Sequence, residues 1–428
     1  MFGQIVDFFS RLVHSRDIRR KIVITGVILA VYRLAAHIPA AGVDRTSLQK
    51  LFTGSPLLSL LDVFSGGTLA NFSVMALALT PYINASIIFQ LLTMVIPKLE
   101  ELSKEGEYGQ ERINQYTRLL TVPLAAVQSL GMYALLTGQG VISRLEPLHL
   151  IAMVVTMTAG SVFSVWLGEL ITEYGIGNGI SFLIFAGIVA RLPVTVAQSV
   201  TTVQSSDLLR ISVFLLLALV IIALIVLVNE AKRNIPITYA RRSVRGLASA
   251  TSILPLKLNQ AGVIPIIFAV SLVFLPSMLA QFLSSANVSD KVYQISLKIT
   301  ELFNPNSFFY NATYFVLVFG FTYFYTSVVF NPEKIAENLQ KNGGFIQGTR
   351  PGVQTKNYLA YVISRITLVG ALFLGFVAIL PSILQNSIGI SNLAIGGTGV
   401  LIVVSVILEM TNELEGQLVM KKYESFIK

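Results

Sequence analysis

The chain has 428 residues, of which 54% are apolar and only 12% are charged. A soluble protein carries about twice that charged fraction, so a polytopic membrane protein is the expected class. The sequence contains no cysteine, which excludes disulfides and thiolate metal sites. Its three histidines, His14, His37 and His149, lack the spacing of metal ligands. We therefore expect no metal and no cofactor.

The first 21 residues form a segment of their own. Phe2, Ile5, Phe9 and Leu12 fall on one face of a helix over 2–13, a pattern typical of a helix that lies on a membrane surface. The basic run begins at Arg11, within and after this apolar stretch and not before it. A cleavable signal peptide has the opposite order. Residues 1–21 are therefore interpreted as a cytoplasmic amphipathic segment.

Ten stretches are apolar enough to cross a bilayer core, which takes about 20 helical residues. They are 22–40, 73–96, 118–138, 148–170, 180–200, 209–229, 262–283, 310–330, 362–384 and 394–411. Residues 412–428 follow them as a tail.

The positions of Lys and Arg orient these spans, because cytoplasmic loops retain basic residues. With the N-terminus inside, twenty-three of the 31 basic residues fall in cytoplasmic segments and seven on the other side. Both ends are therefore expected in the cytoplasm, and this topology accounts for the net charge of +9. The loops 230–261 and 331–361 are longer and more basic than retention requires. Docking of an acidic or ribosomal partner is an equally good interpretation of these two loops.

The region 57–96 is too long for one span and is interrupted. Residues 57–65 are apolar, Gly66 and Gly67 break the helix, and Asn71 and Ser73 are residue types that cap the next one. A half-helix that enters the membrane before a full span is the natural interpretation, and a surface loop is the alternative. Non-helical backbone inside a membrane is tolerated only when it is buried in protein or lines a water-filled cavity. The interruption therefore indicates a pore or a binding cavity.

The expected spans contain almost no ionisable side chains. Arg33 lies toward the outer end of its span, where it can snorkel, and Glu169 and Glu173 lie at the cytoplasmic end of another. Ion-coupled transporters keep a charged group at mid-membrane, and intramembrane hydrolases need a nucleophile with a base or paired aspartates. Neither pattern occurs, so an enzyme is not expected. A secondary transporter for a small solute is the alternative to a channel, and a scaffold or insertase without an open pore is a third hypothesis.

Several short strings stand in one characteristic order and spacing over nearly the whole chain. They are SGGTLANFS at 65–73, PYINAS at 81–86, KEGE at 104–107, QYTR at 115–118, GIGNGIS at 175–181, LPLKLN at 254–259, AGVIP at 261–265, RPGVQT at 350–355 and GGT at 396–398. Together they resemble the SecY family, whose members are the central subunits of the bacterial protein-secretion channel.

The resemblance implies an all-α polytopic membrane fold. Ten transmembrane helices would form two inverted five-helix halves, hinged between the fifth and sixth helices around an hourglass pore. The first half would be 22–204, with a re-entrant plug half-helix at about 58–70. The second would be 205–411, with the cytoplasmic loops 230–261 and 331–361. Two five-helix halves begin on opposite sides of the membrane, as an inverted repeat requires.

The resemblance also assigns family roles to individual positions. A pore ring maps to Ile83, Ile87, Ile184, Ile188, Ile267 and Ile402. The plug maps to Leu60, Leu61, Phe64, Gly66, Gly67 and Leu69. The polar residues of a lateral gate map to Asn84, Gln90 and Ser271, for which ordinary interhelical hydrogen bonding is the alternative. Cytoplasmic partner docking maps to Arg241, Arg242, Arg245 and Arg350.

The expected function is that of the family. The chain would be a protein-conducting channel that passes unfolded secretory polypeptides across the bacterial cytoplasmic (inner) membrane and releases apolar segments laterally into it. Its partners would be secretory preproteins and signal peptides, SecE-like and SecG-like small membrane subunits, the SecA motor ATPase, the ribosome and membrane lipids. Two positions depart from the family pattern: 243–253 lacks its basic, histidine-containing character, and Leu275 stands where an aromatic is common.

Overall fold

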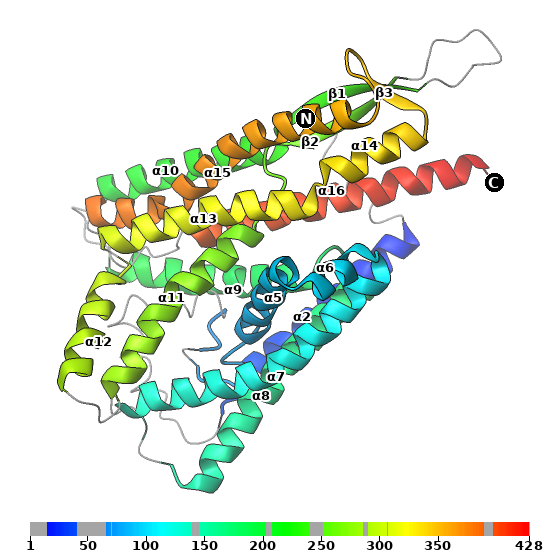
Figure 1. The fold of residues 1–428 in the computed structure, drawn as a ribbon. Coiled ribbons are helices and arrows are strands. Elements are labelled where there is room, and N and C mark those ends of the chain that lie inside the picture. The colour runs from blue at the N-terminus through cyan, green and yellow to red at the C-terminus, as the bar shows by residue number, and fades with distance from the viewer. Residues whose placement is uncertain are drawn as a thin grey trace. The chain divides into compact units, whose positions relative to one another are not determined.

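The computed structural model describes residues 15–40, 66–69, 71–138, 142, 145–202, 208–239, 251–285, 290–305, 307–388 and 397–427. Within these ranges the chain is mostly helical (Figure 1). The helices are α2 (Arg16–Ala36), α5 (Thr80–Val95), α6 (Pro97–Lys104), α7 (Glu107–Gly138), α8 (Pro147–Tyr174), α9 (Gly179–Thr202), α10 (Leu208–Glu230), α11 (Ile264–Ser285), α12 (Asp290–Leu302), α13 (Phe308–Val329), α14 (Pro332–Lys341), α15 (Val353–Ile388) and α16 (Gly397–Ile427). The strands are β1 (Lys232–Tyr239), β2 (Thr251–Lys257) and β3 (Gly344–Ile346).

Each of the ten stretches expected to span a membrane coincides with a helix. These helices are α2, α5, α7, α8, α9, α10, α11, α13, α15 and α16. Three of them begin more than one turn before the apolar stretch, because polar turns extend α2 back to Arg16, α7 back to Glu107 and α15 back to Val353. One begins more than one turn later: α5 starts at Thr80 and not at 73, with Pro81 in its first turn, where the missing N–H of proline costs nothing.

By length and composition, four helical stretches of the described residues can cross a membrane: Glu107–Thr137, Pro147–Tyr174, Phe308–Lys341 and Val353–Leu380. The pair α5 and α6 makes a fifth if a broken span is counted, since the two helices are bent by 103°. Ile96 between them is extended, as expected for a residue before proline. Three further apolar helices are shorter, Gly179–Arg191, Leu216–Glu230 and Ile264–Ser277. The count of ten crossings therefore stays a prediction.

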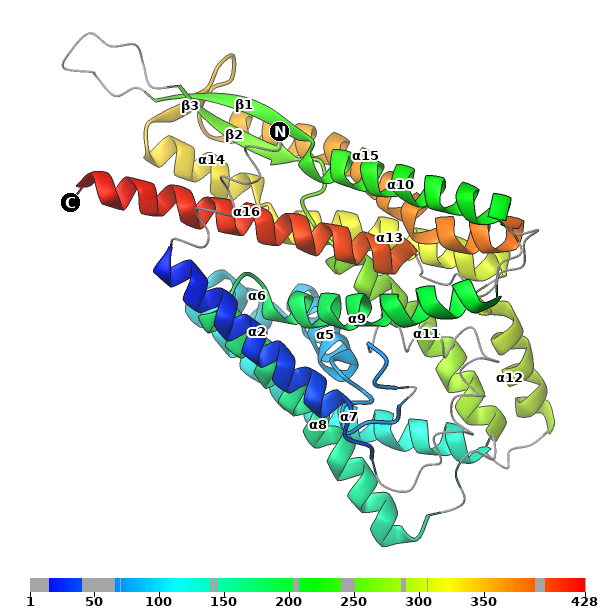
Figure 2. The ribbon, with the colours of Figure 1, turned by 180° about the vertical axis from the view of Figure 1, so that it is seen from behind.

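The chain divides into two compact units. The first contains Met1–Val203, Ser271–Tyr310 and Gly389–Lys428. In this unit α8 is central: α2, α5, α7 and α9 all pack against it, and α16 packs against α9. The ribbons of α2, α7 and α8 run side by side in both views (Figures 1 and 2). A small residue on α8 also allows α9 to approach closely, since an added Cβ at Gly168 would stand 3.0 Å from the Ile180 side chain of α9.

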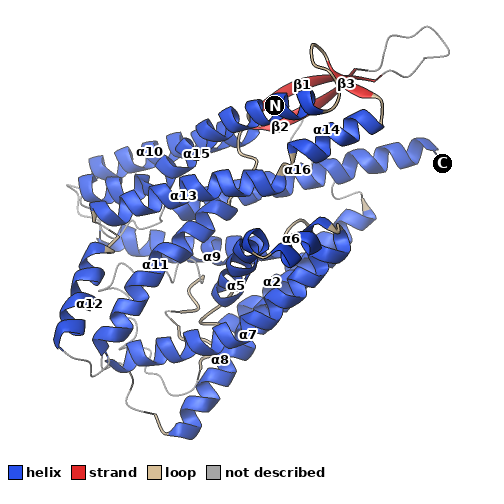
Figure 3. Ribbon diagram, viewed as in Figure 1, coloured by secondary structure: helices blue, strands red, loops and turns tan. Residues whose placement is uncertain are grey.

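The second unit contains Gln204–Val270 and Asn311–Ile388 and holds a three-stranded sheet that the sequence did not indicate (Figure 3). The strand order is β2-β1-β3, with β1 antiparallel to both neighbours. Ile237 is opposite Ser252 on one side and Ile346 on the other. The sheet therefore joins the two long basic loops into one structure, which we call the loop sheet (β1, β2 and β3). The all-α expectation is wrong in this respect.

The loop sheet is held by an apolar cluster beneath it. Ile235, Ile237, Leu256 and Ile346 of the strands are buried together with side chains of α14 and α15, namely Leu339, Leu359, Val362 and Ile363. The alternation along β1 explains the arrangement, because Ile235 and Ile237 share one face and are buried, whereas Asn234 and Pro236 lie on the other face and are exposed. Lys232 lies on the exposed face too, and Arg233 is exposed at the start of the strand.

This cluster predicts an unequal response to two identical truncations in paired strands. Ile237→Ala should destabilise the loop sheet by about 2–5 kcal/mol, because Ile237 is 4% exposed and its loss leaves a cavity. Ile253→Ala should change the stability by less than about 0.5 kcal/mol, because Ile253 is 59% exposed. Amide hydrogen exchange of β1 measures both. Equal exchange in the two variants would contradict the assignment of the buried face.

Candidate functional site

Residues 66–69 and 71–79, which precede α5, are mostly buried and not helical. Gly66 and Gly67 have φ values of 73° and 84°, in the left-handed region that glycine adopts without strain. Gly66 and Gly67 are therefore not helical, as expected, whereas the half-helix predicted before them lies outside the described residues. Residues 66–69 and 71–79 form turns, apart from a bridge at Ser73. We call residues 66–79 the buried turn segment.

The helix was expected to resume at Asn71 or Ser73, and this expectation is wrong. Phe72 and Ala78 have φ values of 43° and 44°, which are uncommon for residues with a side chain. These two residues interrupt the right-handed helical path twice. As a consequence α5 begins only at Thr80.

Protein groups satisfy much of the backbone of the buried turn segment. The Ala40 N–H donates to the Phe72 carbonyl over 2.8 Å, and the Val74 N–H donates to the Ile38 carbonyl over 2.9 Å. The Ser161 hydroxyl of α8 donates to the Ala78 carbonyl over 3.0 Å. The requirement that non-helical backbone in a membrane be paired inside the protein is met here by the chain after α2 and by a serine of α8.

The apolar side chains of the segment pack into the same unit. Leu69, Phe72, Ala76 and Leu77 are buried in one cluster with side chains of α7 and α8, among them Met132, Leu136, Met153 and Met157. Gly160 of α8 lies beside the segment, and a Cβ added there would stand only 2.0 Å from the Val74 carbonyl oxygen. The segment is therefore closely fitted against α8.

Arg33 contacts this segment, and the sequence did not indicate this role. Snorkelling to the interface was expected, whereas the guanidinium turns inward and donates to backbone carbonyls of Gly66, Ala186 and Gly187. The only sequence signal was an arginine inside a span. Its partners lie 33 and more than 150 residues away, so no local pattern reveals them.

Of the residues assigned to the plug, the structure describes Gly66, Gly67 and Leu69. All three are buried in the turn segment. Leu60, Leu61 and Phe64 lie outside the described residues.

The isoleucines assigned to the pore ring occupy four helices. Ile83 and Ile87 lie on α5, Ile184 and Ile188 on α9, Ile267 on α11 and Ile402 on α16. Ile402 is fully buried, Ile188 is 1% exposed and Ile83 is partly exposed. Because α9 packs against α16, the helices that carry Ile184, Ile188 and Ile402 are neighbours. Ile267 belongs to the second unit, so the closed ring stays a prediction.

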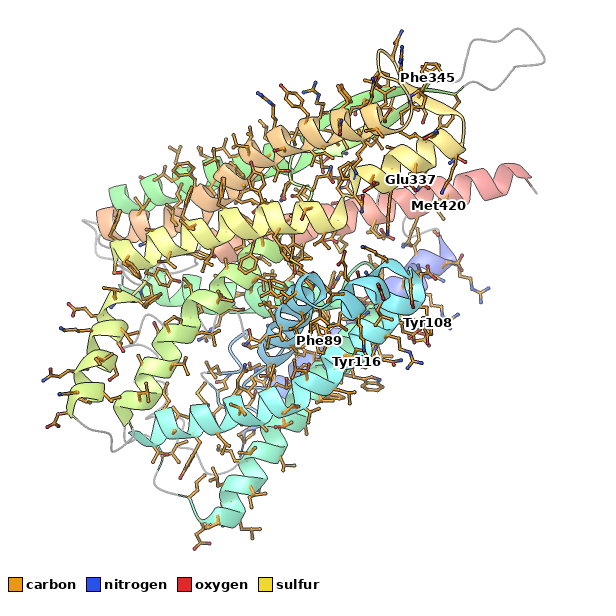
Figure 4. All side chains as sticks on the ribbon, in the orientation of Figure 1. Phe89, Tyr108, Tyr116, Glu337, Phe345 and Met420 are labelled. Atoms are coloured by element: carbon orange, nitrogen blue, oxygen red, sulfur yellow. The ribbon has the colours of Figure 1, made fainter. Side chains whose placement is uncertain are left out.

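The polar residues assigned to a lateral gate are Asn84 and Gln90 on α5 and Ser271 on α11. Gln90 donates to the Ser86 hydroxyl one turn earlier on the same helix, over 3.2 Å. Next to this hydrogen bond, α5 contacts α7 through the stacked rings of Phe89 and Tyr116, 6.0 Å apart, which point toward one another in Figure 4. Leu275 of α11 is 41% exposed. The gate itself stays a prediction.

Arg350 lies in an exposed turn between β3 and α15. Gly352 has a φ of 95°, and the Thr355 hydroxyl donates to the Arg350 carbonyl over 2.9 Å, so the turn is fixed from both sides. The predicted role of the Pro351–Gly352 pair in shaping this turn agrees with that geometry. Arg241, Arg242 and Arg245 lie outside the described residues, in the connection between β1 and β2.

Two further polar contacts of the first unit involve basic side chains of α7. Arg118 of α7 and Glu169 of α8 form an ion pair with a 2.5 Å contact. Arg112 donates to the Tyr108 hydroxyl, and this hydrogen bond raises the pKa of Arg112. Among the residues that the structure describes, no three His, Asp or Glu side chains are grouped to hold a metal. The arrangement offers apolar surface and paired backbone instead of reactive groups.

The chain was compared with known families and proteins. The family model SecY matches residues 73–411. Protein translocase subunit SecY of Mycobacterium bovis is 42% identical over 98% of this chain and 99% of its own length. The protein of the same name from Corynebacterium glutamicum is 43% identical over 96% of this chain and 98% of its own length.

Solved structures show the same fold at low identity. A structure described as that of a protein conducting channel has a TM-score of 0.62 with 18% identity, covering 92% of this chain and 91% of that one. The yeast Ssh1 complex bound to the 80S ribosome has a TM-score of 0.63 with 16% identity, covering 95% of this chain and 89% of that one. With nine strings of the family in register, a family match over most of the chain and relatives above 40% identity, the chain belongs to the SecY family.

Proposed function

We propose that the chain is a protein-conducting channel of the bacterial cytoplasmic membrane. It passes unfolded secretory polypeptides across this membrane and releases apolar segments laterally into it. The observation that carries the proposal is the full-length relationship to SecY translocase subunits, at 42% identity. The buried turn segment supports it independently, because non-helical backbone at membrane depth is typical of pores and cavities. No observation favours a solute transporter.

The proposed topology has ten crossings with both ends in the cytoplasm. The excess of Lys and Arg in the loops assigned to the cytoplasm supports this orientation. Within it, 22–204 and 205–411 are the two inverted halves, 1–21 is a cytoplasmic amphipathic segment, and 412–428 is a cytoplasmic tail. The half-helix at about 58–70 is the plug, of which the Gly66–Gly67 end lies in the buried turn segment.

The six isoleucines Ile83, Ile87, Ile184, Ile188, Ile267 and Ile402 form the proposed pore ring. A collar of branched apolar side chains dewets a narrow passage and so blocks ions. It offers no fixed hydrogen bonds that a passing polypeptide of arbitrary sequence would have to match. An apolar segment that reaches the collar partitions into lipid through the gate beside Asn84, Gln90 and Ser271, whereas a polar chain continues through the ring.

The proposed docking surface is the loop sheet together with the turn at Arg350. β1 begins with the exposed residues Lys232 and Arg233, and Arg241, Arg242 and Arg245 belong to the stretch of sequence between β1 and β2. A ribosome is bound by the structural neighbour Ssh1, and a basic surface suits both ribosomal RNA and an acidic protein. Proposed partners are the ribosome and the SecA motor ATPase here, SecE-like and SecG-like subunits and lipids around the spans, and preproteins with their signal peptides inside.

Photocrosslinking tests the channel directly. A photoreactive residue at position 83, 188 or 402 should form adducts with a stalled secretory precursor, because these positions line the proposed passage. The same photoreactive residue placed at position 155 on α8 should react with lipid, because the native Val155 is 61% exposed. Precursor adducts are measured on gels for all four positions. Adducts at 155 alone, or none with the precursor, would contradict the proposal.

The ring predicts a leak when its apolar character is broken. Ile402→Asn should raise the ion conductance of reconstituted vesicles several-fold, because an amide wets the constriction. Ile407→Asn is the matched control on α16, since Ile407 is 41% exposed and lies outside the ring. Conductance of the two variants is compared with that of the parent. An unchanged leak in Ile402→Asn would remove this residue from the constriction.

The docking surface predicts a position-specific loss of binding. Arg350→Glu should weaken binding to ribosomes or to SecA about tenfold, as expected when one charged contact worth about 1.4 kcal/mol is lost. Lys341→Glu on α14 makes the same change of charge at a site where Lys341 pairs with Glu337 over 3.8 Å. Each affinity is measured at two salt concentrations. Equal losses in both variants would assign the effect to overall charge and not to the Arg350 turn.

A further inference from the structure

The guanidinium of Arg33 joins three parts of the first unit that are distant in sequence. Its Nη1 donates to the Gly66 carbonyl over 3.1 Å. Its Nη2 donates to the Ala186 carbonyl over 2.8 Å and to the Gly187 carbonyl over 3.3 Å. One side chain of α2 therefore links the buried turn segment to the middle of α9.

The backbones of Gly66 and Gly187 are closely packed where Arg33 binds. An added Cβ at Gly66 would stand 2.6 Å from the Gly187 Cα, so two backbones are in direct contact. The neighbouring Gly67 lies beside Arg191 of α9, with 3.4 Å between the position of its Cβ and the Arg191 side chain. The segment is thus seated against α9 by shape, and Arg33 closes the contact from the side.

The chemistry of arginine suits this task better than that of lysine. A planar guanidinium carries five N–H donors in a fixed fork, so one group reaches several carbonyls at once. An ammonium is a point charge that cannot hold these acceptors in the same geometry. A charged group within a membrane span is also costly unless it is paired. Arg33 therefore strongly favours the state in which the segment is seated against α9 over any state in which its N–H donors have no acceptor.

The acceptors on α9 lie in the same turn as two residues of the proposed ring. Ile184 and Ile188 flank Ala186 and Gly187. Because these residues share one turn, a displacement of the turn acts on the ring and on the contacts with Arg33 together. Seating of the segment and closure of the ring are therefore linked through a single helical turn.

We propose that Arg33 is a positioning residue that fixes the Gly66–Gly67 end of the plug to α9. Release of the plug then requires that the guanidinium give up its carbonyl acceptors, and movement of the Ile184–Ile188 turn triggers this release. The inference rests on the proposed function in one respect, namely that the segment ending at Gly66–Gly67 is the plug.

Thiol labelling measures the seating without relying on transport. The chain has no cysteine, so a single Thr68→Cys gives one reporter in the segment, at a position that is 1% exposed. The protein is purified in lipid nanodiscs, which leave both faces accessible, and its reaction with a polar maleimide is followed in time. Ser129→Cys in a separate sample reports on the fold of α7, because Ser129 is fully buried.

Four variants are compared in the Thr68→Cys background. Arg33→Gln removes the charge and the fork, and labelling should become about tenfold faster or more, the factor expected for hydrogen bonds to a charged group. Arg33→Lys keeps the charge and should lie between Arg33→Gln and the parent. Gly66→Ala disturbs the same contact from the opposite side and should also speed labelling. Gly26→Ala, on α2 with nothing within 4 Å of the added Cβ, should not.

The outcomes separate the inference from the proposed function. Unchanged labelling in Arg33→Gln and Gly66→Ala would overturn the role of Arg33, whatever the conductance of these variants. Faster labelling without an ion leak would support the role of Arg33 and count against the segment as a seal. If Ser129→Cys also reacts in the Arg33→Gln variant, that variant has lost its fold. The labelling rates of the Arg33→Lys and Gly66→Ala variants then decide whether Arg33 holds the segment.

Discussion

Peptide groups that leave a helix at membrane depth have to find partners within the protein, and the first unit is organised around this requirement. The buried turn segment places non-helical backbone beside α8. Its partners come from the extended residues after α2, from Ser161 of α8 and from Arg33. Glycine at positions 66 and 160 provides the space in which these groups approach, since a side chain at either would clash with backbone. Gly66, Gly160 and Arg33 thus act together: they let an irregular segment stay inside without exposing its polar groups to lipid.

In the second unit, the loop sheet gives the two long basic connections a fixed structure. Two connections that are far apart in sequence share β1 as a central strand, and their apolar residues are buried on α14 and α15. A partner that binds the turn at Arg350 thereby contacts an element continuous with α15, whose first residue follows that turn. The basic residues do not have to hold the structure together, because the buried isoleucines do so. Charge on the outer face is therefore free to serve recognition.

The sequence predicted the features that depend on local pattern. Apolar stretches of sufficient length located ten of the helices, although not α6, α12 or α14, and the Gly66–Gly67 pair marked a point where the backbone is not helical. The start of α5 was misplaced because nothing in the types of Phe72 and Ala78 signals a positive φ, which their tertiary packing imposes. The loop sheet was missed because Pro236, Pro255 and the flanking charges are typical of loops. In addition, β3, one of the two strands that pair with β1, lies more than 100 residues away. Arg33 was assigned to the interface because the carbonyls that it binds come from two other segments of the chain.

A channel for polypeptides of arbitrary sequence needs a closed state whose contacts do not depend on the cargo. Backbone carbonyls are suited to this, because every residue has one and its position is set by the fold and not by side-chain identity. The contact of Arg33 with Gly66, Ala186 and Gly187 uses only such acceptors. An apolar collar has the same property, since it excludes water without selecting among side chains. The acceptors of Arg33 and the proposed collar residues Ile184 and Ile188 share one turn of α9. In the proposed channel a displacement of that turn would therefore act on both contacts, and closure would be lost cooperatively, as a gate for unrelated substrates requires.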